Sequence, residues 1–138
     1  MDLKKINLSG DEYPLLCTIP LLKDIQDEFG SVTEFSEKLM PSKKEDGKKV
    51  LDDSRLPDAR AIEFALPRMI NDGIRYYNKY HDLEMKPVKA DEIFIKNDQP
   101  LFGVAMAIYT ELWRSINAPK PQPLTETSPA SEAPETRK

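Results

Sequence analysis

The sequence predicts a small α+β fold, mainly α, in which an N-terminal β-hairpin packs on a bundle of about four helices. Two short apolar runs flank a turn near the N-terminus, apolar residues recur at helical spacing from about residue 19 onward, and the composition changes after residue 117. These patterns are typical of a strand pair followed by amphipathic helices. We therefore expect a single body over residues 1–117 and a disordered Pro-rich tail over residues 118–138.

The N-terminal hairpin is predicted from residues 4–18. Residues 4–8 alternate between polar and apolar, Ser9-Gly10 provides turn residues, and residues 13–18 form a second apolar run. Pro14 has no N–H to donate, which restricts it to an edge position or a strand start. Because an isolated two-stranded hairpin is marginally stable in water, it must pack on helices or pair with a second copy of the chain.

Two short helices should follow the hairpin. The first begins near Ile19, with proline in its first turn, and ends at Gly30. The Ser-Val-Thr-Glu sequence at 31–34 is a capping-box pattern, so a second helix should start at once and end before Pro41.

Residues 41–57 are rich in lysine and acidic residues around Gly47. Such charge runs usually form solvated connections. We expect a flexible charged loop, with a transient hairpin around Gly47.

A long third helix is predicted over residues 58–80, because its apolar residues follow a 3.6-residue period. Pro67 lies inside this helix and removes a backbone hydrogen bond, which predicts a kink or break near Ala65. Residues 82–87 should connect to a short helical turn at 91–95.

The last helix is the clearest prediction. Asp98 can cap it, Pro100 suits its first turn, and an unbroken helical pattern extends over residues 101–116. One apolar stripe can dock on the core and consists of Leu101, Ala105, Ile108, Leu112 and Ile116. A second stripe beside it consists of Phe102, Met106, Tyr109 and Trp113.

Two interpretations of the second stripe remain open. It can complete the protein's own core against the hairpin or the third helix, or it can be a docking surface for another protein. Aromatic residues and methionine are enriched at protein interfaces, which favours docking. The candidate partner-binding residues are Phe102, Met106, Tyr109 and Trp113, with Phe64 and Ile74 of the third helix as weaker candidates.

The sequence indicates no catalytic, metal or cofactor site. The single histidine, His81, and the single cysteine, Cys17, fit no nucleophile motif and are too few for a typical zinc site. A net charge of −4 with no basic stripe argues against a nucleic-acid partner. The sequence has neither a signal-peptide pattern nor an apolar run of the ~20 residues that span a bilayer, so we expect a soluble, non-enzymatic protein with no membrane partner.

After residue 117 the sequence becomes rich in proline. Five of the last 20 residues are proline, and Leu124 is the one sizeable apolar residue among them. Such a segment buries too little apolar surface to offset the entropy of ordering, so we expect it to be disordered.

The pattern of the chain resembles a known family. A hairpin entering EYPLLCTIPLLKDIQDEFGSVTEF at 12–35, a polar loop, ALPRMINDGI at 65–74 and a final amphipathic helix are similar to the tail assembly chaperones of long-tailed phages and prophages of Gram-positive bacteria. The resemblance covers residues 4–117, and its strongest part is the Tyr-Pro-Leu strand entry followed by a helix ending in Phe-Gly.

The resemblance implies a non-enzymatic role in the bacterial host cytoplasm. Such chaperones coat the hydrophobic, helical tape measure protein and help to recruit tail tube subunits, in many members through an added C-terminal domain. The implied partners are therefore the tape measure protein and the tail tube protein. Two other classes stay open, namely a minor structural tail or connector component of the virion and a small host-directed protein-binding adaptor.

Overall fold

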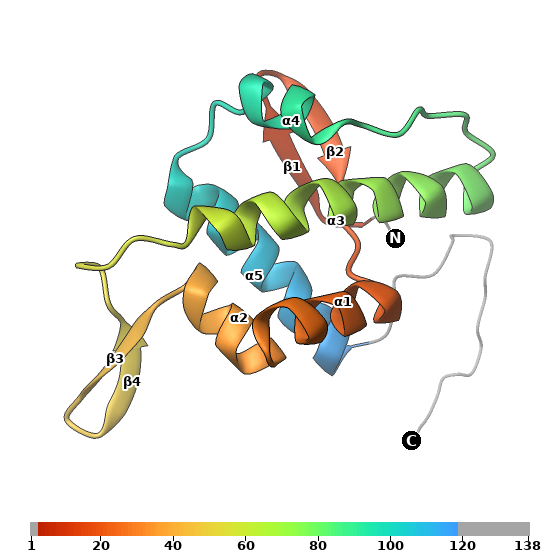
Figure 1. The fold of residues 1–138 in the computed structure, drawn as a ribbon. Coiled ribbons are helices and arrows are strands. Elements are labelled where there is room, and N and C mark those ends of the chain that lie inside the picture. Colours follow the sequence, from red (N-terminus) through yellow and green to blue (C-terminus); the bar gives the residue numbers. More distant parts are fainter. Residues whose placement is uncertain (1–2, 119–138) are drawn as a thin grey trace.

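The computed structural model describes residues 3–118 and is mainly helical, with an antiparallel hairpin at the N-terminus, as predicted (Figure 1). The predicted tail, apart from Ala118, lies outside the described residues. In chain order the elements are β1 (Lys5–Leu8), β2 (Asp11–Pro14), α1 (Ile19–Phe29), α2 (Val32–Leu39), β3 (Ser42–Glu45), β4 (Lys48–Leu51), α3 (Ala59–Tyr80), α4 (Ala90–Lys96) and α5 (Leu101–Asn117).

The N-terminal hairpin joins β1 and β2 through a two-residue turn. Ser9 and Gly10 both have positive φ, of 52° and 90°, as a type I′ turn requires. Pro14 is the last residue of β2 and lies opposite Lys5 in a sheet of only two strands, so it occupies an edge, as predicted. The hairpin contacts α3 so closely that a Cβ on Gly73 would lie 2.9 Å from the Cβ of Pro14.

The short helices α1 and α2 have the caps that the sequence predicts. Gly30 ends α1 with a φ of 95°, in the region that favours glycine. The Ser31 hydroxyl then accepts a hydrogen bond from the Glu34 N–H at 3.0 Å, which starts α2. This tight link places α2 directly after α1, and the two helices pack against each other.

Residues 42–51 form a second regular hairpin, where the sequence predicts a flexible loop. Strands β3 and β4 pair antiparallel, and their turn residues Asp46 and Gly47 have φ values of 53° and 77°. The Asp-Gly turn is again of the type that matches the twist of paired strands. The hairpin predicted around Gly47 is therefore part of the fold, and it projects from the helical body (Figure 1).

Helix α3 continues unbroken through Pro67, so the predicted break is absent. Pro67 itself is buried, and Leu66, Met69 and Ile70 around it are fully buried. A proline costs ~3 kcal/mol in a helix interior. Burial of several large apolar side chains can exceed that cost, since each contributes ~1.5–3 kcal/mol.

Helix α4 is positioned mainly by hydrogen bonds, because Ile93 is its one buried residue. Before it, the Asn71 side chain binds both backbone groups of Val88, accepting from the N–H at 2.7 Å and donating to the C=O at 3.1 Å. After it, Ser9 in the first hairpin donates its N–H to the Asp98 carboxylate at 3.0 Å. The prediction that Asp98 caps α5 is therefore wrong. The N-cap residue is Pro100, and no side chain caps the helix.

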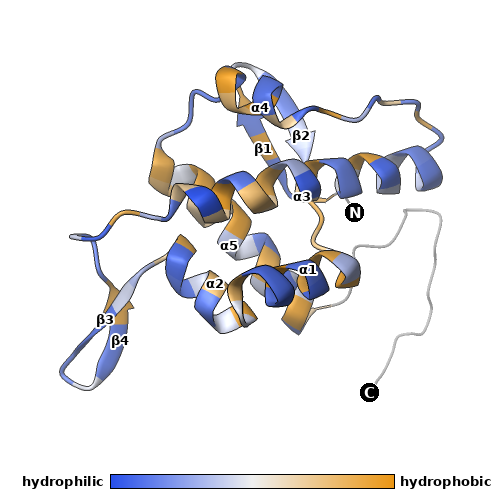
Figure 2. Ribbon diagram, viewed as in Figure 1, coloured by the Kyte–Doolittle hydropathy of each residue, from blue (hydrophilic) through white to orange (hydrophobic). Residues whose placement is uncertain are grey.

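The core lies between α3, α5, α2 and the first hairpin. Its largest fully buried side chains include Leu8, Phe35, Met69, Ile108 and Leu112, from β1 and the helices α2, α3 and α5. Figure 2 shows the hydrophobic colouring concentrated along α5 and the inner sides of the other helices. None of the helices within residues 3–118 is long and apolar enough to cross a membrane.

Candidate protein-binding surface

Helix α5 buries one face against α2 and α3. Val104, Ala105, Ile108 and Leu112 are almost completely buried there. The two ends of the stripe that was predicted to pack on the core are more exposed than its centre, since Leu101 is 37% and Ile116 42% exposed. The buried part of this stripe is therefore shorter than the sequence predicts.

The C-terminal half of the second stripe packs on the protein's own core. Tyr109 and Trp113 are half-buried against the core cluster, with ring centroids 6.3 Å apart. The Trp113 indole N–H donates to the Ser36 hydroxyl of α2 at 3.1 Å. For Trp113 the structure favours the core interpretation.

The N-terminal half of the stripe is more open. Met106 is 46% exposed, and Phe102, one turn earlier, is half-buried. Tyr109, one turn later, shares a small pocket with Val50 and Leu51 of β4, and Leu51 is itself 44% exposed. We call Phe102, Met106 and Tyr109 the α5 outer stripe; it is an apolar strip that its own fold covers only in part.

The two weaker candidates on α3 do not join this stripe. Ile74 is 2% exposed within the core, so it cannot contact a partner, and its assignment to a binding surface is wrong. Phe64 is half-buried, with its ring 5.4 Å from the ring of Phe29 in α1 and Arg68 stacked over its face. It belongs to the α1–α3 contact.

Sequence reasoning missed a buried carboxylate. Glu111 is an acidic residue in the middle of α5, yet it is 1% exposed. It accepts the Cys17 backbone N–H at 2.8 Å and forms an ion pair with Arg114 at 2.7 Å. The signal was available, because Glu111 lies seven residues after the buried Val104 and so shares its helix face.

The same surroundings affect the thiol of Cys17. Burial raises its pKa from 9.0 to about 11, and the Glu111 carboxylate adds to the shift. A hydrogen bond with Ser115 opposes that shift. The thiol is therefore protonated at neutral pH and has little nucleophilic character.

An apolar groove of about 800 Å³ lies between α4 and the N-terminal ends of α3 and α5. The large apolar side chains that line it are those of Ile62, Phe94, Ile95 and Leu101, and its acidic side chains are those of Glu63 and Asp91. We call it the α4 groove. It lies on the opposite flank of α5 from Met106, as their positions on the helix require.

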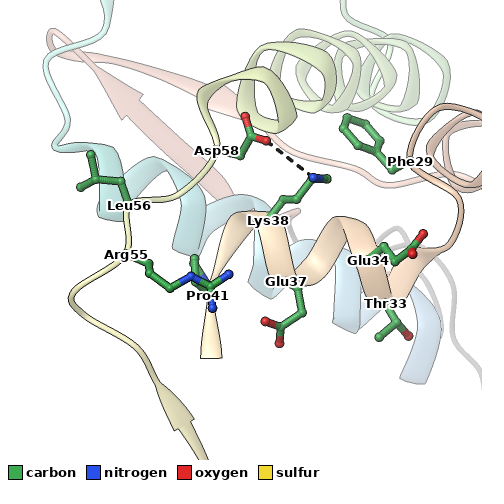
Figure 3. A pocket seen from close by; sticks show the side chains of 9 residues that line it. All are labelled: Phe29, Thr33, Glu34, Glu37, Lys38, Pro41, Arg55, Leu56 and Asp58. Atoms are coloured by element: carbon green, nitrogen blue, oxygen red, sulfur yellow. Dashed lines mark ion pairs between the residues drawn. The ribbon is translucent and has the colours of Figure 1, made fainter. Parts of the chain in front are cut away.

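A second hollow, of about 690 Å³, lies between α2 and the segment leading into α3 (Figure 3). Four of its charged side chains are already paired: Lys38 with Asp58 at 3.9 Å, Glu37 with Lys49 at 3.2 Å, and Arg55 with Asp52 at 3.9 Å. A Ser42 hydrogen bond, above all, lowers the pKa of Glu37. This polar hollow leaves few uncompensated groups for a ligand.

Among residues 3–118 there is no group of three or more His, Cys, Asp and Glu side chains arranged to hold a metal ion. His81 follows α3, with its ring 4.8 Å from that of Tyr77. Comparison with known proteins gave no matching family model, curated sequence or solved structure.

Proposed function

We propose that this chain is a non-enzymatic phage tail assembly chaperone that binds the hydrophobic, helical tape measure protein and helps to recruit tail tube subunits. The observation that carries the proposal is the α5 outer stripe, where Met106 is 46% exposed between two aromatic residues. The resemblance of residues 12–35 and 65–74 to this family is the reason for naming the tape measure protein as the bound partner, or client.

The chemistry of the stripe suits an apolar helical client. Methionine is unbranched and polarizable, so it adapts to varied apolar partners, and aromatic neighbours add large contact area. An amphipathic helix presents apolar groups at i, i+3, i+4 and i+7, which can lie along Phe102, Met106 and Tyr109. Leu51 of β4 extends the apolar strip beyond α5.

The test is co-expression with the tape measure protein of a long-tailed phage of Gram-positive bacteria. Met106→Glu should remove co-purification and leave the tape measure protein insoluble, because a carboxylate would be buried in the contact. Ile19→Glu is the matched control, since Ile19 is an 80% exposed apolar residue at the start of α1, outside the α5 outer stripe. It should retain binding. Both variants should keep the far-ultraviolet circular dichroism of the parent.

Trp113 is a poor position for this test. Its indole packs on α2 and donates to Ser36, so a charged substitution would damage the fold. Retained binding by Met106→Glu would contradict the proposal. So would stoichiometric amounts of the chain in mature particles, since a structural tail component stays in the virion and an assembly chaperone leaves.

A further inference from the structure

Several of the large apolar side chains that line the α4 groove are exposed to solvent. Ile95 is 87% exposed, and Leu101 at the start of α5 is 37% exposed. Phe94, which lines the same groove, is half-buried. Contiguous exposed apolar side chains bounded by polar ones are typical of protein-docking sites.

Three charged side chains line the groove, namely the basic Arg60 and the acidic Glu63 and Asp91. Arg60 is engaged elsewhere, since it pairs with Glu28 of α1 and its guanidinium lies 5.1 Å from the centre of the Phe29 ring. Glu63 and Asp91 are exposed, and neither forms an ion pair within residues 3–118. The groove therefore offers an apolar floor with uncompensated negative charge on two walls.

Several contacts attach helix α4 to the rest of the fold. Ile93 is its one buried residue, the Asn71 side chain hydrogen-bonds the segment before it, and Ser9 donates to the Lys96 carbonyl at its end. The Lys96 ammonium also pairs with Asp11 and donates to the Tyr13 hydroxyl at 2.8 Å. The α4 wall of the groove is therefore fixed to α3 and to the first hairpin.

From this arrangement we propose that the α4 groove binds an amphipathic helix whose apolar stripe is flanked by lysine or arginine. The apolar stripe covers Ile95, Phe94 and Leu101, and the basic residues lie against Glu63 and Asp91. The site is separate from the α5 outer stripe, so it stands whether or not the chain is a tail chaperone. Complementary charge fixes the sign of the partner and speeds its association.

The experiment uses the full chain and two fluorescein-labelled helical peptides of about 18 residues, or five turns. Both carry the same Leu/Ala stripe, flanked by lysine in one and by glutamate in the other. Fluorescence anisotropy should show the lysine peptide binding about tenfold more tightly or better, with the preference falling as salt rises.

Two sets of variants locate the site. Ile95→Asn should weaken binding of the lysine peptide about tenfold, as expected for loss of a central apolar contact. Ile19→Asn is the matched control, because Ile19 is 80% exposed at the start of α1, away from the groove. Glu63→Gln with Asp91→Asn should leave both peptides bound with similar affinity.

Three results would overturn the proposal. The first is equal binding of the two peptides to the parent chain. The second is an Ile95→Asn variant that binds as the parent does. The third is a dimer of the chain alone, seen by sedimentation and removed by Ile95→Asn, because the occupant of the groove would then be a second copy.

Discussion

The carboxylate of Glu111 accepts a hydrogen bond from the backbone N–H of Cys17 across 2.8 Å, in a place where Glu111 is 1% exposed. Glu111 is on α5, and Cys17 is in the segment that joins the first hairpin to α1. One buried side chain thus connects the last helix to the start of the chain, and its ion pair with Arg114 balances its charge.

Removing this carboxylate should be costly. Glu111→Ala removes the acceptor of the buried Cys17 N–H and the ion pair with Arg114, and we expect a loss of about 2–4 kcal/mol in the free energy of unfolding. Glu111→Gln should lose less, because an amide can still accept from one of these two residues. Urea denaturation measures both. Glu92→Ala, at an exposed position on α4, is the control and should change stability by less than about 0.5 kcal/mol.

The raised pKa of Cys17 predicts a dependence of stability on alkaline pH. Its pKa is 9.0 without burial and about 11 in the fold. Folding therefore favours the protonated thiol, and this contribution is complete below pH 9.0 and is lost as the pH rises toward 11. Because tyrosines and lysines also titrate there, the comparison is with Cys17→Ala, which should lose less stability between these pH values. Equal losses would contradict the burial of the thiol.

Gly73 and Gly103 should respond in opposite directions to alanine. At Gly73 the added Cβ would lie 2.9 Å from the Pro14 Cβ and 3.0 Å from its backbone. Overpacking of this kind costs about 1–3 kcal/mol, which exceeds the ~1 kcal/mol that alanine gains in a helix. At Gly103 the nearest atom, in Pro100, is 3.4 Å away, so Gly103→Ala should raise thermal stability. A stabilised Gly73→Ala would show that the hairpin is further from α3.

The Asn71 side chain should contribute to the stability of the fold and to the position of α4. Asn71→Ala removes both hydrogen bonds to Val88, and we expect a loss of about 1–3 kcal/mol. Amide hydrogen exchange should accelerate in α4, whose position depends on that segment. Asn117→Ala, at the exposed end of α5, should leave exchange in α4 unchanged.

The helices and their caps were largely predictable because their signals are local. Ser31 with Glu34, Gly30 and the 3.6-residue period of α3 act within a few residues, and the structure has each of them. The role of Asp98 was not predictable in this way. Its partner, Ser9, is 89 residues away, and a local pattern cannot choose between capping α5 and binding a distant turn.

The candidate surface was only half predictable, for a similar reason. Helical spacing placed Phe102, Met106, Tyr109 and Trp113 together, yet it carried no information on which neighbours cover them. The position of α2 decides that Trp113 is covered while Met106 is open. Ile74 was assigned to the surface because it falls off the main apolar stripe of the third helix, and in the unbroken helix it is buried in the core.

Trp113 also gives the molecule a built-in optical reporter. It is the single tryptophan of the chain, and its half-buried indole sits where α2 meets α5, bonded to Ser36 and close to the ring of Tyr109. Any partner that settles on α5 near Met106, or any separation of the two helices, will change the polarity around that one indole. The tryptophan fluorescence of the unlabelled protein can therefore report partner binding or helix separation at the α2–α5 contact, because no other tryptophan contributes to it.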